Sequence, residues 1–332
     1  MATRAATPPD QPVSVCLVRP PSVPEVDVAT VDAVMPVGLA YLAGALAAPG
    51  HRVQVIDAVG EALNQYSTIA GYPRTLLHGL TTPEIVERID AGTEVLGVTC
   101  MFSVEWPFIA ALLAAVRQRL PGVLIVLGGE HVTALPEYSL QECPALDVAV
   151  LGEGEETLVE LVEAQRAGRA LATVPGIMVR AGGGVVRTPP RSRIRSIDEI
   201  PEPAWSLFPV EEYMQNEVTF GPNLGRCMPV IASRGCPYQC TFCSSPQMWT
   251  TFWGARRPEQ VLAEIKTYIR DYRATNFDFY DLTMIIKKEW IKEFCRLLIA
   301  EGLEITWQLP SGTRSEAIDE EVAGLLFASG CR

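Results

Sequence analysis

The stretch Val123-Leu-Ile-Val-Leu-Gly-Gly-Glu-His-Val-Thr133 is a run of five apolar residues that ends at a glycine pair. Similar short apolar runs occur at residues 13–18, 52–56, 95–101 and 148–151. Helical patterns separate them at residues 35–47 and 106–120, and Thr82 is the expected N-cap of another helix, while residues 60–80 show no clear pattern. This alternation predicts an α/β domain in which helices cover both faces of a mostly parallel sheet.

The composition limits the class of protein. The chain has 332 residues, 48% of them apolar, which is enough for two ordinary hydrophobic cores. A net charge of -12 argues against a nucleic-acid partner, and no apolar run is long enough to span a membrane. The nine cysteines are an odd number, and residues 1–10 lack the apolar core of a signal peptide. We therefore expect a cytoplasmic protein with reduced thiols.

A second informative stretch is Ser233-Arg-Gly-Cys-Pro-Tyr-Gln-Cys-Thr-Phe-Cys-Ser-Ser-Pro246, which contains Cys236, Cys240 and Cys243. Three thiolates can each bind one iron of a 4Fe-4S cluster and leave the fourth iron open to another ligand. A zinc site is the alternative, with Cys227 as the fourth ligand, but zinc sites usually consist of two separated cysteine pairs. The pattern therefore favours a 4Fe-4S cluster bound by these three residues.

This cysteine motif, with an aromatic residue before the third cysteine, closely resembles that of the radical S-adenosylmethionine (SAM) superfamily. The resemblance implies that SAM binds the open iron and that an external donor similar to flavodoxin or ferredoxin supplies an electron. A 5'-deoxyadenosyl radical is the implied product. The resemblance places SAM contacts at Phe242, Tyr280, Asp281, Ser311 and Arg314. For Asp281 a cap of the following turn, and for Arg314 a surface salt bridge, remain alternatives.

The loops after the predicted strands indicate a second cofactor. Open α/β sheets bind ligands at the carboxyl ends of their strands, where residues 19–21, 99–103, 128–133 and 152–155 are expected to gather. With residues 36–42 and 50–57, these loops resemble the cobalamin-binding domain that precedes a radical SAM domain in one large class of enzymes. The implied cobalamin contacts are Pro20, Pro36, Gly38, Leu39, Thr99, Cys100, Met101, Ser103, Gly128, Gly129, His131, Val132, Thr133, Gly152, Glu153 and Gly154. A nicotinamide site is disfavoured because no G-x-G-x-x-G opens the first helix.

None of the three histidines, His51, His78 and His131, lies in the D-x-H-x-x-G pattern that places a histidine under cobalt in many cobalamin proteins. We therefore expect no histidine ligand on the lower face of the cobalt. His131 lies in a strand-end loop and could contact the cofactor, but a loop histidine more often hydrogen-bonds its own backbone than binds a metal.

The domain organisation follows from composition and resemblance. Residues 13–180 are expected to form a Rossmann-like (flavodoxin-like) cobalamin-binding domain, and the proline-rich residues 181–227 a linker whose basic run, 187–195, is solvated. Residues 228–332 are expected to form the first half of a radical SAM (β/α) barrel, with strands at 229–233, 276–282 and 304–309. Three β/α units of the usual six indicate a partial chain, with the third strand as a bare edge.

The resemblance implies a cobalamin-dependent radical SAM enzyme, foremost a methyltransferase that acts on an unactivated carbon or a phosphinate of a small molecule. Two alternatives remain. One is a ring-forming cyclase that uses the same cofactors, and the other is an inert module that binds cobalamin and the cluster. The sequence identifies no general base and no substrate.

Overall fold

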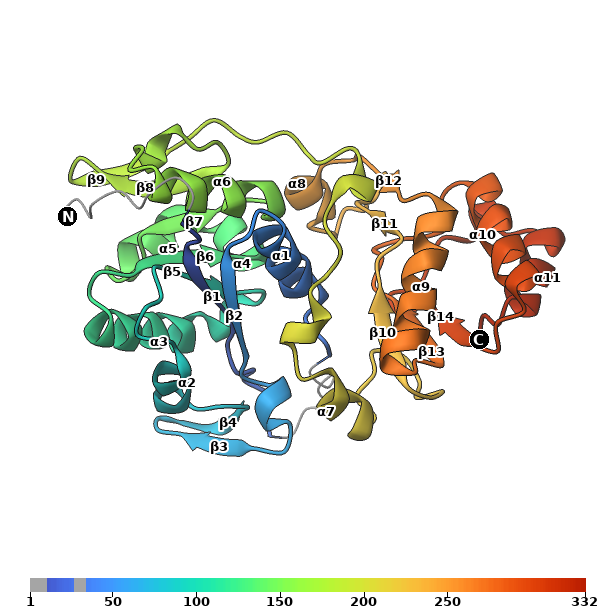
Figure 1. Ribbon diagram of the computed structural model, residues 1–332, viewed down its shortest axis with the longest axis horizontal. Coiled ribbons are helices and arrows are strands. Elements are labelled where there is room, and N and C mark those ends of the chain that lie inside the picture. The colour runs from blue at the N-terminus through green and yellow to red at the C-terminus, as the bar shows by residue number, and fades with distance from the viewer. Residues whose placement is uncertain (1–10, 27–33) are drawn as a thin grey trace. The chain divides into compact units, whose positions relative to one another are not determined.

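The computed structural model describes residues 11–26 and 34–332, drawn in Figure 1. Residues 1–10, on which the argument against a signal peptide rested, lie outside the described residues. The chain divides into two compact units. One comprises Met1–Arg193 with Pro201–Val210, and the other comprises Ile194–Ile200 with Glu211–Arg332. None of the helices in the described ranges combines the length and the apolar character that a membrane crossing needs.

The first unit is built on a seven-stranded sheet in the order β2-β1-β5-β6-β7-β8-β9. Its strands are β1 (Ser14–Arg19), β2 (Arg52–Asp57), β5 (Val95–Thr99), β6 (Leu124–Gly128), β7 (Val148–Val150), β8 (Ile177–Ala181) and β9 (Gly184–Arg187). Strands β1 to β7 of this sheet are parallel, and β8 and β9 are antiparallel additions. The five parallel strands have the flavodoxin-like order 2-1-3-4-5, which confirms the predicted α/β class.

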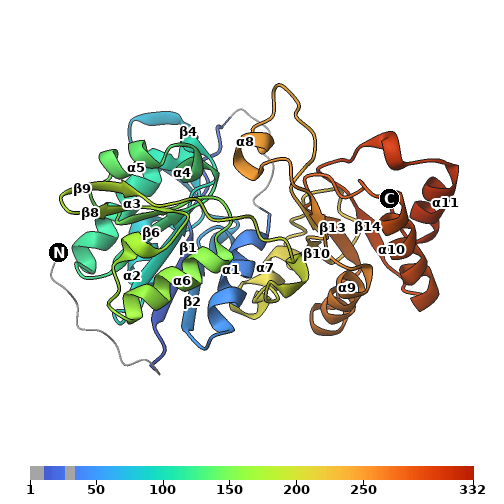
Figure 2. The same cartoon turned by 90° about the horizontal axis from the view of Figure 1, so that it is seen from above.

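Helices pack on the faces of this sheet (Figures 1 and 2). They are α1 (Val37–Ala47), α2 (Thr82–Arg88), α3 (Trp106–Arg119), α4 (Glu130–Ala134), α5 (Pro136–Glu142) and α6 (Glu155–Arg166). Helix α1 contacts α6, and α2 contacts α3. The unassigned residues 60–80 fold into a 3-10 turn (Gly60–Ala62) and a hairpin of β3 (Tyr66–Ile69) and β4 (Tyr72–His78).

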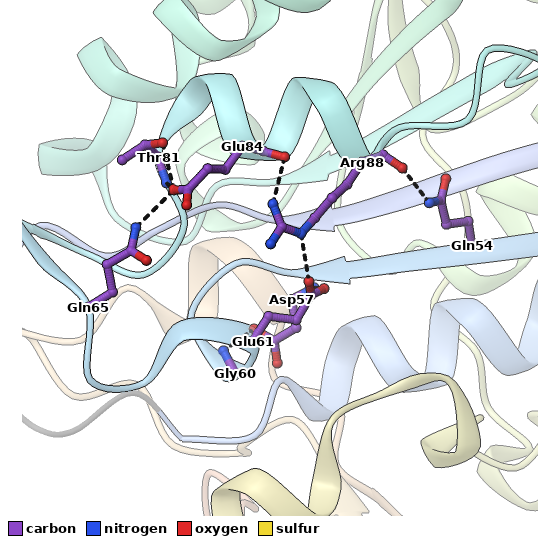
Figure 3. Close-up of polar contacts among 8 residues, drawn as sticks. All are labelled: Gln54, Asp57, Gly60, Glu61, Gln65, Thr81, Glu84 and Arg88. Atoms are coloured by element: carbon purple, nitrogen blue, oxygen red, sulfur yellow. Dashed lines mark hydrogen bonds and ion pairs between the residues drawn. The ribbon is translucent and has the colours of Figure 1, made fainter.

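Helix α2 begins one residue earlier than the sequence indicated, because Thr81 and not Thr82 is its N-cap. The Glu84 carboxylate accepts hydrogen bonds from the Thr81 backbone N–H at 2.7 Å and from the Thr81 hydroxyl at 2.6 Å. The Gln65 amide donates to the same carboxylate at 2.8 Å, as Figure 3 shows. These hydrogen bonds, led by that of the Thr81 hydroxyl, hold the pKa of Glu84 at about 2. Thr81 and Glu84 form a capping box, which fixes the start of the helix.

Part of the predicted linker is built into the first unit. Strand β9 pairs with β8, so residues 184–187 belong to the sheet. Within the basic run 187–195, Arg191 forms ion pairs with Glu156 and Glu160 of α6, and Arg193 binds Glu153. Arg187 and Arg195 are exposed. The prediction of a solvated run thus holds for only part of the run, because the two prolines that suggested it give no sign of the acidic residues of α6.

The second unit contains a parallel sheet in the order β10-β13-β14, with β10 (Cys227–Val230), β13 (Asn276–Phe279) and β14 (Thr306–Gln308). Strands β11 (Ser233–Arg234) and β12 (Gly254–Ala255) form a separate antiparallel pair. The helices along this part of the chain are α7 (Val210–Gln215), α8 (Ser245–Trp249), α9 (Pro258–Tyr272), α10 (Lys288–Glu301) and α11 (Glu320–Ala328).

Three fully buried aromatic rings hold the second unit together. Phe279 of β13, Phe294 of α10 and Trp307 of β14 pack edge to face, with ring centroids 5.5 to 5.7 Å apart. The outer edge of β14 is not bare, as the sequence had suggested. The Trp307 backbone N–H donates to the Gly330 carbonyl at 3.0 Å, and the Trp307 carbonyl accepts from the Arg332 backbone N–H at 3.0 Å. These two bonds form a parallel bridge between Trp307 and Cys331. The bare-edge prediction was wrong because the last residues fold back beside this strand.

Candidate functional site

The cysteine motif lies in the loop that follows β10 and the short strand β11. The Cys236 and Cys240 side chains are half-buried, and Cys243 is exposed. The Cys243 N–H donates to the Cys240 carbonyl at 3.0 Å, and the Ser245 N–H donates to the Cys243 Sγ at 3.4 Å. Backbone N–H groups that point at sulfur are a common feature of iron-sulfur sites. The three cysteines therefore match a cluster site in residue type and in their spacing along the sequence.

The other six cysteines are poorer ligands. Burial raises the pKa of each of their thiols, and the residues are Cys16, Cys100, Cys143, Cys227, Cys295 and Cys331. The proposed zinc ligand Cys227 opens β10, where its thiol is buried beside Asp278. Within residues 11–26 and 34–332, no three His, Cys, Asp or Glu side chains are grouped as metal ligands. The three loop thiols would thus have to draw together to share a cluster, and their assignment as ligands stays a prediction.

Asp281 anchors the strand end that leads into the cysteine loop. It is buried, and its carboxylate accepts hydrogen bonds from the Ala232 N–H at 3.1 Å and from the Ser233 hydroxyl. Burial, partly offset by these bonds, raises its pKa to about 6. The carboxylate thus binds the first residue of β11 and the residue before it. From the sequence, Asp281 was expected to cap the following turn or to contact SAM. The hydrogen bonds to Ala232 and Ser233, which lie 49 and 48 positions earlier in the chain, were not predicted.

Arg314 lies beside the cysteine loop. Its guanidinium carbon is 4.2 Å from the centroid of the Tyr238 ring, and Tyr238 lies between two of the motif cysteines. Arg314 also forms the surface salt bridge considered above, with Glu316 at 2.8 Å. Hydrogen bonding to Glu316 is the main cause of the raised pKa of Arg314, and Cys240 adds a smaller electrostatic contribution. The structure therefore brings this candidate to the motif, and contact with SAM stays a prediction.

The other SAM candidates differ in exposure. The Phe242 side chain is 91% exposed, and Ser311 is exposed in the loop after β14. Tyr280 is half-buried and packs edge-on against Phe220 at 5.4 Å. Their assignment rests on the resemblance, and the side-chain contacts do not add to it.

In the first unit, the loops after β5, β6 and β7 are tied together at the carboxyl edge of the sheet. The Cys100 N–H donates to Gly128 at 2.8 Å, and the His131 N–H donates to Cys100 at 3.2 Å. Gly129 has φ +109°, and a Cβ there would meet the Cys100 carbonyl oxygen at 2.4 Å, so only glycine fits. The Thr133 hydroxyl donates to the Gly129 carbonyl at 2.9 Å and accepts from the Gly152 N–H at 3.1 Å. These bonds make one continuous rim.

The predicted cobalamin contacts separate into three groups by exposure. Six have buried side chains or rings: Pro20, Leu39, Cys100, His131, Val132 and Glu153. The Glu153 carboxylate is held by Arg193 at 2.9 and 3.2 Å, which is a structural role. Gly38, Met101 and Ser103 are exposed, and the remaining candidates, Pro36, Thr99, Gly128, Gly129, Thr133, Gly152 and Gly154, are partly exposed.

Two exposed apolar residues on this rim were missed by the sequence reasoning. Phe102 is 64% and Val104 65% exposed, and they flank Ser103 next to Met101, which is 46% exposed. Large apolar side chains rarely cluster in water without a function. Their position in the loop after a buried strand was a usable signal, because that loop was already expected to meet a ligand.

Known proteins match the chain both within the first unit and across most of its length. Residues 26–162 match the B12 binding domain family. An uncharacterized methyltransferase of Pyrococcus horikoshii, PH0819, is 33% identical over 297 residues, which cover 89% of this chain and 59% of that protein. The anaerobic magnesium-protoporphyrin IX monomethyl ester cyclase of Cereibacter sphaeroides is 30% identical over 307 residues, covering 89% of this chain and 46% of that one.

A solved structure with a similar fold is that of the radical SAM methyltransferase TsrM from Kitasatospora setae, with tryptophan substrate and a SAM analogue bound. It has a TM-score of 0.70 at 20% identity and covers 96% of this chain and 58% of TsrM. The present chain thus spans about three fifths or less of the length of these proteins. The matched B12 binding domain, the cysteine motif and the relatives all indicate the same class of proteins. The chain belongs to the class of proteins that join a B12-binding domain to a radical SAM domain.

Proposed function

We propose that this chain is the cofactor-binding part of a cobalamin-dependent radical SAM methyltransferase that acts on a small molecule. The observation that carries the proposal is the position of the motif cysteines. They lie in a loop at the carboxyl end of the first strand of a parallel α/β unit, in a chain that also contains a B12 binding domain. Carboxyl ends of parallel strands are where such folds place their chemistry.

The cofactors supply the reactivity: the cluster and SAM would supply a 5'-deoxyadenosyl radical, and cobalamin a methyl group. The chain's own residues hold and orient them. Cys236, Cys240 and Cys243 would bind three irons, and Asp281 would keep the start of their loop in place through Ala232 and Ser233. The side chain of Arg314, which already lies against the loop at Tyr238, carries the charge that suits the SAM carboxylate.

On the first unit, the exposed side chains Met101, Phe102 and Val104 would cover apolar parts of the corrin, while the glycines of the rim let the backbone approach. The candidates on the loops after β6 and β7 would contact the same ligand from the adjoining rim. Free cysteines in the described residues support a reducing compartment, the cytoplasm. The external protein electron donor is proposed from the resemblance to radical SAM proteins alone.

The test is anaerobic reconstitution of the chain with iron, sulfide and cobalamin. Cys240→Ala should lose the optical and EPR signals of the cluster, while Cys227→Ala, which removes the zinc candidate, should keep them. Addition of SAM and a reductant to the native chain should then release 5'-deoxyadenosine. An assembled cluster that releases none would leave the inert binding module as the better description of this polypeptide.

A ring-forming cyclase is the second candidate, because a magnesium-protoporphyrin cyclase matches the chain at 30% identity. The product distinguishes the two functions. A methyltransferase adds the mass of one methylene group to its substrate, whereas ring formation adds none of the methyl carbon of SAM. Transfer of label from methyl-labelled SAM into a product would support methylation, and its absence from a turned-over product would support the cyclase.

A further inference from the structure

A short chain of hydrogen bonds runs from the core of the first unit to Ser103 in the loop after β5, which is called the rim loop below. His131 is buried, at 3% exposure, and its ring stacks on Trp106 with 5.0 Å between ring centroids. Its Nδ1 lies 2.8 Å from the Ser103 Oγ, and its Nε2 lies 3.2 Å from the Ser139 Oγ. Both ring nitrogens therefore have a serine partner, and the ring connects an exposed hydroxyl to a buried one.

Which atom donates in each of these hydrogen bonds is fixed by a further bond, from Ser139 to the backbone. The Ser139 Oγ is 2.8 Å from the carbonyl oxygen of Leu135. A carbonyl has no proton, so two oxygens this close require the Ser139 proton between them. Ser139 then has only lone pairs left for His131, so Nε2 must carry the ring proton. A neutral imidazole has one proton, which leaves Nδ1 as an acceptor. Burial lowers the pKa of His131, which favours this neutral form.

The proton position on His131 fixes the orientation of the exposed Ser103 hydroxyl. Since Nδ1 accepts, the Ser103 hydroxyl must donate its single proton inward, and only its lone pairs face outward. Ser103 is exposed and follows β5, which lies beside β1 at the point where the strand order reverses. Ligands of open α/β sheets bind at this crevice.

We propose that Ser103 is an obligatory hydrogen-bond acceptor for a donor group of the cofactor, and that His131 is the positioning residue that fixes this polarity. The donor would be a primary amide or a hydroxyl, both of which cobalamin carries at its periphery. This inference rests on the proposed function for the identity of the ligand, and the direction of the hydrogen bonds stands apart from it.

The first experiment tests the direction of the bonds without any cofactor. Histidine-labelled protein is analysed by 1H–15N correlation NMR, which distinguishes protonated from unprotonated ring nitrogens. The chain has three histidines, so His51→Gln and His78→Gln variants assign the signals. We expect His131 to be neutral with its proton on Nε2. A proton on Nδ1, or on both nitrogens at neutral pH, overturns the inference.

The second experiment measures the affinity of the full chain for aquocobalamin. Ser103→Ala should weaken binding about fivefold, the value of one ordinary hydrogen bond, and Ser103→Thr, which keeps the acceptor, should stay within about twofold of the native chain. His131→Leu should weaken binding to a similar degree. His131→Asn should restore it, because the amide offers a carbonyl oxygen close to the place of Nδ1.

The double variant separates positioning from a purely structural role. If His131 acts through Ser103, His131→Leu should have no further effect on affinity in the Ser103→Ala background, whereas independent structural damage would add to it. Unchanged affinity in Ser103→Ala, or full additivity, overturns the role of the pair. If the native chain takes up no cobalamin, the proposed function fails together with the assignment of the ligand, and the NMR result alone decides whether the polarised chain exists.

Discussion

Replacing Asp281 by asparagine should change how stability depends on pH. Burial raises the pKa of this carboxyl from 3.8 to about 6, so the native state binds its proton more tightly than the unfolded chain does. The stabilisation from this residue is complete below the unfolded pKa and is lost as pH rises through about 6. The full loss is about 3 kcal/mol, of which about 2.5 kcal/mol falls between pH 4 and pH 8.

The amide of the Asp281→Asn variant cannot ionise, so the variant lacks this dependence. Its amide oxygen can accept from only one of the two donors that Asp281 binds, the Ala232 N–H and the Ser233 hydroxyl, which costs about 1 to 2 kcal/mol at every pH. The free energy of unfolding of the native chain, minus that of the variant, should therefore fall by about 2.5 kcal/mol from pH 4 to pH 8.

The assay is urea unfolding of both proteins across this pH range, followed by tryptophan fluorescence. Four of the six tryptophans belong to the second unit, at Trp249, Trp253, Trp290 and Trp307. Asp271→Asn is the matched control, because Asp271 is exposed and hydrogen bonding to Arg270 lowers its pKa, the opposite direction. A difference between native chain and Asp281→Asn that stays constant with pH to within about 0.5 kcal/mol would refute the reasoning.

Three further outcomes are expected. Glu84→Gln should lower the free energy of unfolding by about 1 kcal/mol at pH 7 and by less as pH falls from 4.5 towards 2, because the native carboxylate loses its charge there; urea unfolding measures both. Gly44→Ala should destabilise by about 2 kcal/mol or more, since a Cβ would lie 2.0 Å from the Glu202 carbonyl oxygen, whereas Gly38→Ala in the same helix meets nothing within 4 Å and should not lower the melting temperature. Cluster assembly should slow amide hydrogen exchange in residues 236–244, because the thiols must draw together; unchanged exchange in a protein with a full cluster signal would contradict this.

The parallel sheet and the cysteine motif were predictable because their signals are local. A run such as residues 123–127 must be buried on both faces, whatever its neighbours are, and three cysteines within eight residues retain their spacing in any fold. Similarly, the start of α9 after Arg257 follows from the proline at its first position.

What the sequence could not show depends on partners that are distant along the chain. Asp281 meets residues 232 and 233, and Arg193 meets Glu153, with about 40 to 50 residues between the partners. In the rim loop, Cys100 turns inward and Met101 outward, a difference of one residue that a resemblance to a family does not resolve. Sequence therefore located the candidate loops, and the structure separated their exposed residues from their buried ones.

The division of the chain into two units has a consequence for attempts to study either unit alone. Residues 194–200 pack with the second unit, where Asp198 pairs with Arg257 at 3.1 Å. Residues 201–210 return to the first unit, where the Ala204 N–H donates to Ala40 at 3.0 Å and Trp205 is buried. Because the two segments are interleaved, no single cut of the polypeptide releases both units whole. A cut after residue 193 strips the first unit of the buried Trp205, and a cut after residue 210 strips the second unit of the partner of Arg257.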